Sequence, residues 1–109
     1  MNYDVITSES FVRQLKKLSK KYGSLKQEVD ELGNMLSENP TLGTPIGKDC
    51  YKIRLAIKSK GKGKSGGARV ISCVVAVQES VILLSIYDKS QQDNIDEKEL
   101  ERLLKECFN

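Results

Sequence analysis

The spacing of apolar residues changes several times along the chain, and each spacing predicts a different element. Residues 3–6 form a short β-favouring run that we expect to be the first strand. After Ser8 the apolar positions recur three and four residues apart, which indicates one face of a helix. These positions are Phe11, Leu15, Leu18 and Tyr22. We expect this helix to end at Gly23.

A second helix is expected to start at Ser24, where Gln27 three residues later completes a capping-box pattern. The helix must stop before Pro40. Its apolar stripe consists of Leu25, Val29, Leu32 and Leu36. Because the connection is short, the two helices should form an antiparallel hairpin. Neither stripe is wide enough to make a core alone, so a sheet must cover both.

The rest of the chain reads as strands followed by a final helix. Residues 39–47 carry both prolines and are expected to be a linker. Residues 50–57 alternate, with Arg54 on the polar face, which predicts a strand. The apolar runs 68–77 and 80–87 predict two central strands joined by a tight turn at Glu79-Ser80. Counting back from that turn places residues 70–72 opposite residues 87–89.

The last helix has a clear start signal, with Asp96 as N-cap, Glu99 as its capping-box partner and Ile95 stapled to Leu100. Its apolar face consists of Leu100, Leu103, Leu104 and Cys107. The predicted order is therefore β-α-α-β-β-β-α. We expect an α+β fold with an antiparallel-type sheet, an α-hairpin packed on it and a C-terminal helix.

Length and composition narrow the class of protein. A chain of 109 residues is enough for a single domain, which we place at residues 1–109. It has no apolar run long enough to span a bilayer and no signal-peptide pattern at its start, so we expect a cytoplasmic protein. Three cysteines without C-x-x-C spacing, in a chain without histidine, argue against a disulfide framework or a zinc site. We expect no metal and no cofactor.

The net charge of +3 is unevenly distributed. The segment from Lys48 to Arg69 carries eight basic residues and only one acidic residue, Asp49. This concentration of positive charge favours a polyanion as the partner. The alternative is a solvated, lysine-rich loop that only keeps the protein soluble.

The sequence SKGKGKSGGARVIS, residues 59–72, imitates two phosphate-binding motifs. A dinucleotide fingerprint needs a helix after its glycines, whereas a strand follows here. A P-loop needs a glycine at position 58, which is occupied by Lys58. Both matches fail. The segment is better described as a glycine-rich connection between strands, in which Gly66 and Gly67 allow a positive φ or a close backbone approach.

A second group of residues follows the last strand, in the sequence IYDKSQQDN. In extended geometry Tyr87 and Lys89 share one face of the sheet and Asp88 points to the other. The expected pairing brings Arg69 close to both. Without histidine or a carboxylate cluster, phosphodiester cleavage here would have to be metal-free, with the 2′-OH of RNA as nucleophile. Nearby positive charge would favour the Tyr87 phenolate and stabilise the developing charge on phosphorus oxygens.

The sequence KGKGKSGGARVI, followed by an apolar hairpin and LLSIYDKSQQDNIDEKELERLLKE, resembles the RelE/ParE superfamily of bacterial toxins, in particular its HigB/RelE-like branch. The resemblance covers nearly the whole chain. It implies a toxin of a type II toxin–antitoxin system that acts as a ribosome-dependent mRNA endonuclease and inhibits translation. Its implied partners are a cognate antitoxin, the ribosome and mRNA. Matching positions imply Arg69, Tyr87 and Lys89 as catalytic residues, and Arg54, Lys58, Lys60, Lys62 and Lys64 as RNA-binding residues.

Two other functions remain open at this stage. The chain could be a ParE-type poison of DNA gyrase without nuclease activity, because both branches share one fold. It could also be a degenerate toxin that only binds its antitoxin. Asp88 departs from the family pattern, in which a small or neutral residue is common between the tyrosine and the lysine. If Asp88 faced the site, it would lower the local positive potential.

Overall fold

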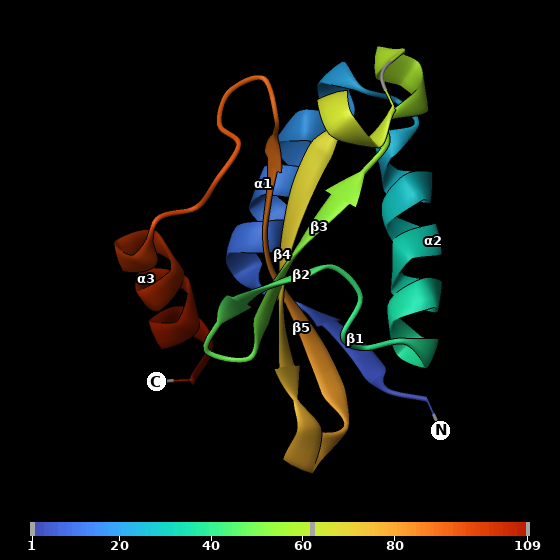
Figure 1. Ribbon diagram of the computed structural model, residues 1–109. Helices are drawn as coiled ribbons and strands as arrows, with labels where there is room; N and C mark the ends of the chain where they lie inside the picture. The colour runs from blue at the N-terminus through green and yellow to red at the C-terminus, as the bar shows by residue number, and fades with distance from the viewer. Residues whose placement is uncertain (1, 62, 109) are drawn as a thin grey trace.

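The computed structural model describes residues 2–61 and 63–108 and contains a five-stranded sheet with helices on both faces (Figure 1). The helices and strands are β1 (Asp4–Thr7), α1 (Glu9–Lys21), α2 (Leu25–Glu38), β2 (Thr44–Gly47), β3 (Cys50–Leu55), β4 (Ala68–Val75), β5 (Ser80–Asp88) and α3 (Glu97–Phe108). Three short 3-10 turns are η1 (Lys58–Lys60), η2 (Lys64–Gly66) and η3 (Ala76–Gln78). The expected α+β class and the order of its helices are confirmed.

The strands lie in the order β1-β5-β4-β3-β2. β1 is parallel to β5, and the other neighbours are antiparallel, so the sheet is mixed. The segment expected to be a linker contains β2, which pairs with the start of β3 along the edge of the sheet. The sequence did not indicate β2, because Pro45 and two glycines interrupt the alternation of apolar and polar residues. Edge strands tolerate such a composition.

The hairpin between β4 and β5 differs from its prediction in register. Its connection is η3 followed by Glu79, which has a φ of 48° in the left-handed region. Ser80 already belongs to β5 and pairs with Val75. A bulge between Ile71 and Ser72 shifts the register once more. The expected pairing of residues 70–72 with 87–89 is therefore wrong, because the turn lies earlier in the chain, at residues 76–79, and the bulge offsets only part of the resulting shift.

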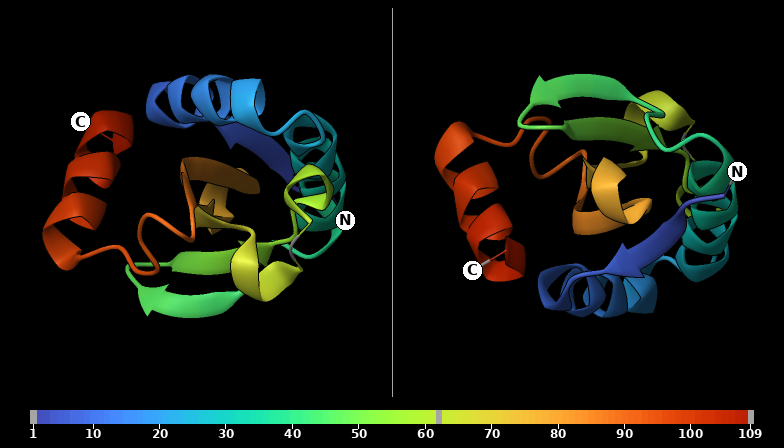
Figure 2. Two further views of the ribbon diagram at one scale, coloured as in Figure 1. Left: turned by 90° about the horizontal axis from the view of Figure 1, so that it is seen from above. Right: turned by 90° about the horizontal axis from the view of Figure 1, so that it is seen from below.

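Two apolar clusters fill the two faces of the sheet. The first lies under α1 and α2 and includes Phe11, Leu25 and Leu83 among its buried residues. The second lies under α3 and includes Ile71, Leu84 and Leu103. The end-on views in Figure 2 show the α1–α2 hairpin and α3 on opposite sides of the strands. The predicted helical stripes face these clusters, which accounts for the spacing of their apolar residues.

Ser8 and Asp96 cap α1 and α3, and of these two caps only the one at Asp96 was predicted from the sequence. The Ser8 hydroxyl accepts a hydrogen bond from the Phe11 amide, and the Asp96 carboxylate accepts one from the Glu99 amide. The capping box at α2 is wrong. Ser24 has helical φ and ψ, and its side chain makes no capping bond. Its hydroxyl instead donates to Glu28 and forms a hydrogen bond with the Ser59 hydroxyl. Ser59 belongs to the basic loop, residues 58–67, which connects β3 to β4.

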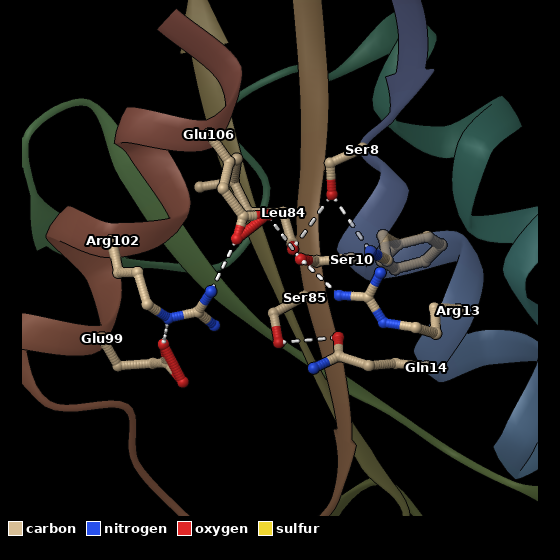
Figure 3. Close-up of polar contacts among 10 residues, drawn as sticks. Ser8, Ser10, Arg13, Gln14, Leu84, Ser85, Glu99, Arg102 and Glu106 are labelled. Carbon is tan, nitrogen blue, oxygen red and sulfur yellow. Dashed lines mark hydrogen bonds and ion pairs between the residues drawn. The ribbon is translucent and has the colours of Figure 1, made fainter. Parts of the chain in front are cut away.

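Polar contacts attach α3 to the start of α1 (Figure 3). The Ser10 hydroxyl donates to Glu106 Oε1 at 2.7 Å, and Arg102 pairs with the other oxygen of Glu106 at 2.6 Å. The hydrogen bond from Ser10 is the main reason that the pKa of Glu106 lies below its usual range. Within the described part of the chain, no helix has the length and apolar composition needed to cross a membrane.

Candidate nucleic-acid interface

Strand pairing places three of the predicted site residues in one row. Arg69 of β4 lies directly opposite Arg54 of β3 on one side and opposite Tyr87 of β5 on the other. Directly opposed residues of antiparallel strands point to the same face of a sheet. The row therefore runs across three strands on the α3 face, at the end of the sheet where the basic loop (residues 58–67) joins β3 to β4. Arg54 is exposed and belongs to none of the ion pairs among the described residues.

Arg69 is only 2% exposed, and its guanidinium is largely occupied by the protein itself. Nη1 donates to the carbonyls of Lys64 and Ala68, and Nη2 donates to the carbonyl of Ser65. Nε lies 3.4 Å from the Asp93 carboxylate. A planar guanidinium suits several acceptors at fixed angles. Arg69 therefore organises the η2 part of the basic loop, and Asp93 covers its remaining side.

Tyr87 is 7% exposed, and its hydroxyl donates to the Asp93 carbonyl at 3.3 Å. Burial raises the pKa of Tyr87, the nearby Asp93 charge raises it further, and Arg69 lowers it only in part. The expectation that positive charge favours the phenolate is therefore wrong for this conformation. Tyr87 is a neutral phenol at pH 7, which makes it a hydrogen-bond donor and a possible proton donor.

Lys89 lies just beyond β5, in the turn that follows Asp88. Its backbone amide donates to the Gly67 carbonyl at 3.0 Å, so the base of this turn is fixed to the base of the basic loop. The extended geometry used to place Tyr87 and Lys89 on one face stops at Asp88. Lys89 is thus next to the site through its backbone, while its side chain is partly exposed.

Asp88 points to the opposite face from Tyr87, as expected from strand alternation. It is 1% exposed and accepts hydrogen bonds from Lys60 Nζ at 2.6 Å, Tyr22 Oη at 2.8 Å, and both the amide and the hydroxyl of Ser90. Burial alone would raise the pKa of this carboxyl, but the donors, Lys60 first, hold its pKa well below the usual range. The Asp88 charge is thus neutralised locally and faces away from the Arg69–Tyr87 row.

The basic loop is attached to the α-hairpin by a second carboxylate. Glu28 of α2 is 7% exposed and accepts a hydrogen bond from the backbone amide of Lys58 at 2.7 Å. Ser59 contacts Ser24 next to it. Glu28 and Asp88 therefore fix the η1 part of the loop at its backbone and at the Lys60 side chain. Lys60 is diverted to the hairpin face and is not a free cation of the loop.

Three of the other predicted cations line one groove. Arg54, Lys58 and Lys64 line a groove between α2 and the edge of β3, next to the start of β2. Glu28 and Glu31 line the same groove, so its charge is mixed. Lys62, the remaining predicted RNA-binding residue, lies outside the described residues.

Gly67 is required at the base of the loop by a close approach of two backbones. A Cβ atom built on Gly67 would lie 2.1 Å from the Leu55 carbonyl oxygen. The φ of Gly67 is −86°, so the requirement concerns space and not a left-handed conformation. Of the two sequence-based explanations for the double glycine, the close approach is thus the one that applies to Gly67.

Sequence reasoning missed the carboxylates that organise this site. Asp93 contacts both Arg69 and Tyr87, and Glu28 holds the Lys58 amide. Asp93 belongs to an irregular segment whose spacing carries no signal. The position of Glu28 did carry a signal, because it lies next to Val29 in the apolar stripe of α2. A carboxylate buried at such a position needs a hydrogen-bonding partner.

The fold and this row of residues define a small α+β domain in which a basic loop is held by Arg69 next to Arg54 and Tyr87. The sequence model of the family described as "RelE toxin of RelE / RelB toxin-antitoxin system" matches residues 4–107. The chain therefore belongs to the RelE toxin family, the toxins of toxin–antitoxin systems.

Solved structures show the same fold. The free Escherichia coli toxin RelE, in a variant with two arginine-to-alanine changes, is similar over 96% of this chain and 97% of its own, at 18% identity and a TM-score of 0.64. The RelBE2 toxin–antitoxin complex of Mycobacterium tuberculosis matches at 19% identity and a TM-score of 0.59, covering 81% and 99% of the two chains. The intact E. coli RelBE complex matches at 26% identity and a TM-score of 0.55, covering 79% and 95%.

Proposed function

We propose that this toxin is a ribosome-dependent mRNA endonuclease that cleaves without a metal and so inhibits translation. The observation that carries the proposal is the row Arg54–Arg69–Tyr87 across three adjacent strands beneath the basic loop. Guanidinium groups bind phosphate with paired hydrogen bonds, and lysines on a glycine-rich loop contact a nucleic-acid backbone without reading its sequence. Membership of the RelE family supports the same function, and the HigB-like branch remains a prediction.

In the proposed reaction, the 2′-OH of one nucleotide attacks its own 3′-phosphate and the 5′-oxygen of the next nucleotide leaves. The bond formed is 2′-O–P and the bond broken is P–O5′; the 2′-OH proton passes to water and the leaving 5′-oxygen takes up one proton, so the products are a cyclic phosphate and a free 5′-hydroxyl. Arg54 and Arg69 stabilise the charge that develops on the phosphorus oxygens. As a neutral phenol, Tyr87 donates a hydrogen bond or a proton to the oxygens of this phosphate. Lys89 adds positive charge from the neighbouring turn.

The free protein holds this site in a covered state. Asp93 occupies Arg69 and Tyr87 with its carboxylate and its carbonyl, respectively. RNA must replace Asp93 before its phosphate reaches these groups, and a substrate already positioned on the ribosome pays less orientational entropy in doing so. This is a physical reason for dependence on the ribosome. We also propose a cognate antitoxin, as in the toxin–antitoxin complexes of similar fold, and a cytoplasmic location.

The test is induced expression followed by mapping of mRNA 5′ ends, together with cleavage of purified mRNA with and without ribosomes. We expect new ends in translated messages for the wild type and roughly a hundred-fold fewer for Tyr87→Phe and Arg69→Lys. Arg54→Ala should reduce cleavage less, because Arg54 is exposed. Lys98→Ala, an exposed position on α3, is the control and should cleave like the wild type.

Circular dichroism spectra establish that each variant is folded before its activity is compared. Breaks that persist in both Tyr87→Phe and Arg69→Lys would overturn the assignment of this row. Growth arrest with intact mRNA would replace the proposal with gyrase poisoning. Neither arrest nor cleavage by the wild type would indicate a toxin fold without nuclease activity.

A further inference from the structure

The thiols of Cys50 and Cys73 lie side by side in the sheet, on the face covered by α3. Cys50 is the first residue of β3 and is directly opposite Cys73 of β4. Both are buried, at 1% and 4% exposed, and both are free thiols. The Cys50 thiol donates to the Lys48 carbonyl at 3.4 Å, and the neighbouring thiols shift each other's pKa. They lie at the other end of the strands from Arg54 and Arg69, about 13 Å away along β3.

The backbone ladder shows which kind of cross-strand pair this is. The amide of Val74 donates to the Asp49 carbonyl at 2.9 Å. In an antiparallel ladder, that bond belongs to the pair next to Cys50 and Cys73, so the two cysteines form a non-hydrogen-bonded pair. At such positions the Cα atoms approach to about 4.5 Å and the side chains are closest. This separation falls within the range that a disulfide requires.

The two thiols also differ in reactivity and access. The adjacent Cys50 thiol lowers the pKa of Cys73, whereas the proximity of Cys73 and burial raise the pKa of Cys50. Cys73 lines a hollow between β4 and the end of α3, together with Leu104 and Phe108. A small oxidant therefore has a route to the sulfur that is more readily a thiolate. In the described part of the chain, no group of three histidine, cysteine or carboxylate side chains is placed to hold a metal.

We propose that Cys50 and Cys73 form a reversible intrachain disulfide when the protein meets a peroxide. The Cys73 thiolate attacks the peroxide O–O bond, which gives a sulfenic acid on Cys73 and an alcohol or water. The Cys50 sulfur then attacks the Cys73 sulfur, and the sulfenic oxygen leaves as water with the proton of the Cys50 thiol. Overall, two thiols lose two electrons and two protons, and the peroxide is reduced.

The crosslink closes a ring that contains β3, the basic loop and the first part of β4. Closing such a ring restricts the unfolded chain, so the oxidised protein should melt about 10 °C higher than the reduced protein. Cys107 of α3 belongs to the same apolar cluster and is the competing thiol. A Cys73–Cys107 bond would attach α3 to the sheet, whereas the proposed bond leaves α3 free.

The experiment uses the full chain, reduced and then treated either with hydrogen peroxide or with a glutathione redox buffer that allows exchange to equilibrium. Free thiols are blocked, and crosslinked peptides are identified by mass spectrometry. We expect the Cys50–Cys73 crosslink in the wild type and in Cys107→Ser, with the rise in Tm reversed by dithiothreitol. Cys50→Ser should lack both the crosslink and the rise in Tm.

Two outcomes would overturn the proposal. One is that Cys50 and Cys73 stay free in Cys107→Ser in a strongly oxidising glutathione buffer, in which burial cannot protect them indefinitely. The other is that Cys73–Cys107 is the main crosslink of the wild type. Because Cys107→Ser retains both proposed partners, the test does not depend on the folding of a variant with an altered strand.

Discussion

Lys60 of the basic loop donates to Asp88 at 2.6 Å, on the face of the sheet opposite to Arg69 and Tyr87. The side chains of this pair are 14% and 1% exposed, respectively, so the ion pair is largely shielded from water. Asp88 had been expected to weaken the site if it faced Tyr87. It instead holds one end of the basic loop against the α-hairpin, where Tyr22 also donates to it.

Asp88→Asn should lower the free energy of unfolding by about 3 kcal/mol at pH 7, because it leaves Lys60 charged, buried and uncompensated. Chemical denaturation measures this change. Asp30→Asn, at an exposed position of α2, is the matched control and should stay within about 0.5 kcal/mol of the wild type. Equal effects of the two substitutions would show that the ion pair contributes nothing to stability.

The same carboxylate should make stability depend on pH in the acid range. The pKa of Asp88 in the folded protein lies below its value of about 3.9 in unfolded chains. Its contribution is therefore present in full above the unfolded pKa and is lost as the pH falls through the folded pKa. Between about pH 6 and pH 3, the free energy of unfolding should fall more for the wild type than for Asp88→Asn. Parallel pH profiles would contradict this assignment.

Gly67→Ala should destabilise the protein by about 2 kcal/mol or more, because the added methyl group overlaps the Leu55 carbonyl. Gly63→Ala is the matched control in the same loop. Its Cβ would meet nothing within 4 Å, and its φ of −73° suits alanine. Thermal melts of both variants measure the difference. A melting temperature for Gly67→Ala equal to that of Gly63→Ala would mean that the base of the loop is not tightly packed.

Asp93→Ala should strengthen the binding of a short single-stranded RNA by roughly two- to five-fold, the range expected for an ion pair whose carboxylate is exposed to solvent. The substitution removes a negative charge 3.4 Å from Arg69 Nε, where the phosphate is proposed to bind. Fluorescence anisotropy over a range of salt concentrations measures this affinity. Asp30→Ala controls for the change in net charge. If both variants gain equally, the effect is one of total charge and not of the site.

Glu106→Gln should loosen the attachment of α3 to α1, because it removes the charge of the carboxylate that accepts the hydrogen bond from Ser10 of α1. We expect amide hydrogen exchange in the last turns of α3 to become several-fold faster. Ser10→Ala should produce part of the same effect. The double variant should add little to Glu106→Gln, since the two residues share one hydrogen bond. Full additivity would show that they act independently.

The pattern of apolar and polar residues in the sequence determined the helices, their apolar faces and four of the five strands, namely β1, β3, β4 and β5. Phe11, Leu25 and Leu103 could be assigned to a core because helical spacing depends only on neighbours along the chain. β2 was not predicted. It is a short edge strand that pairs only with β3, so its residues, which include Pro45, need not alternate between apolar and polar. The glycine at position 67 could be assigned a role because few backbones come so close without one.

Only the tertiary structure decided what surrounds each residue of the site. The pairing of Arg69 with Tyr87 depends on a turn conformation and a bulge, and a change of a few residues in either would move the partner. The pKa of Tyr87 and that of Asp88 depend on burial and on Lys60 and Asp93, which are distant in sequence or lie in an irregular segment. Charge, composition and spacing along the chain therefore predict the type of site. Long-range packing determines the protonation of Tyr87 and Asp88 and places Asp93 over the site.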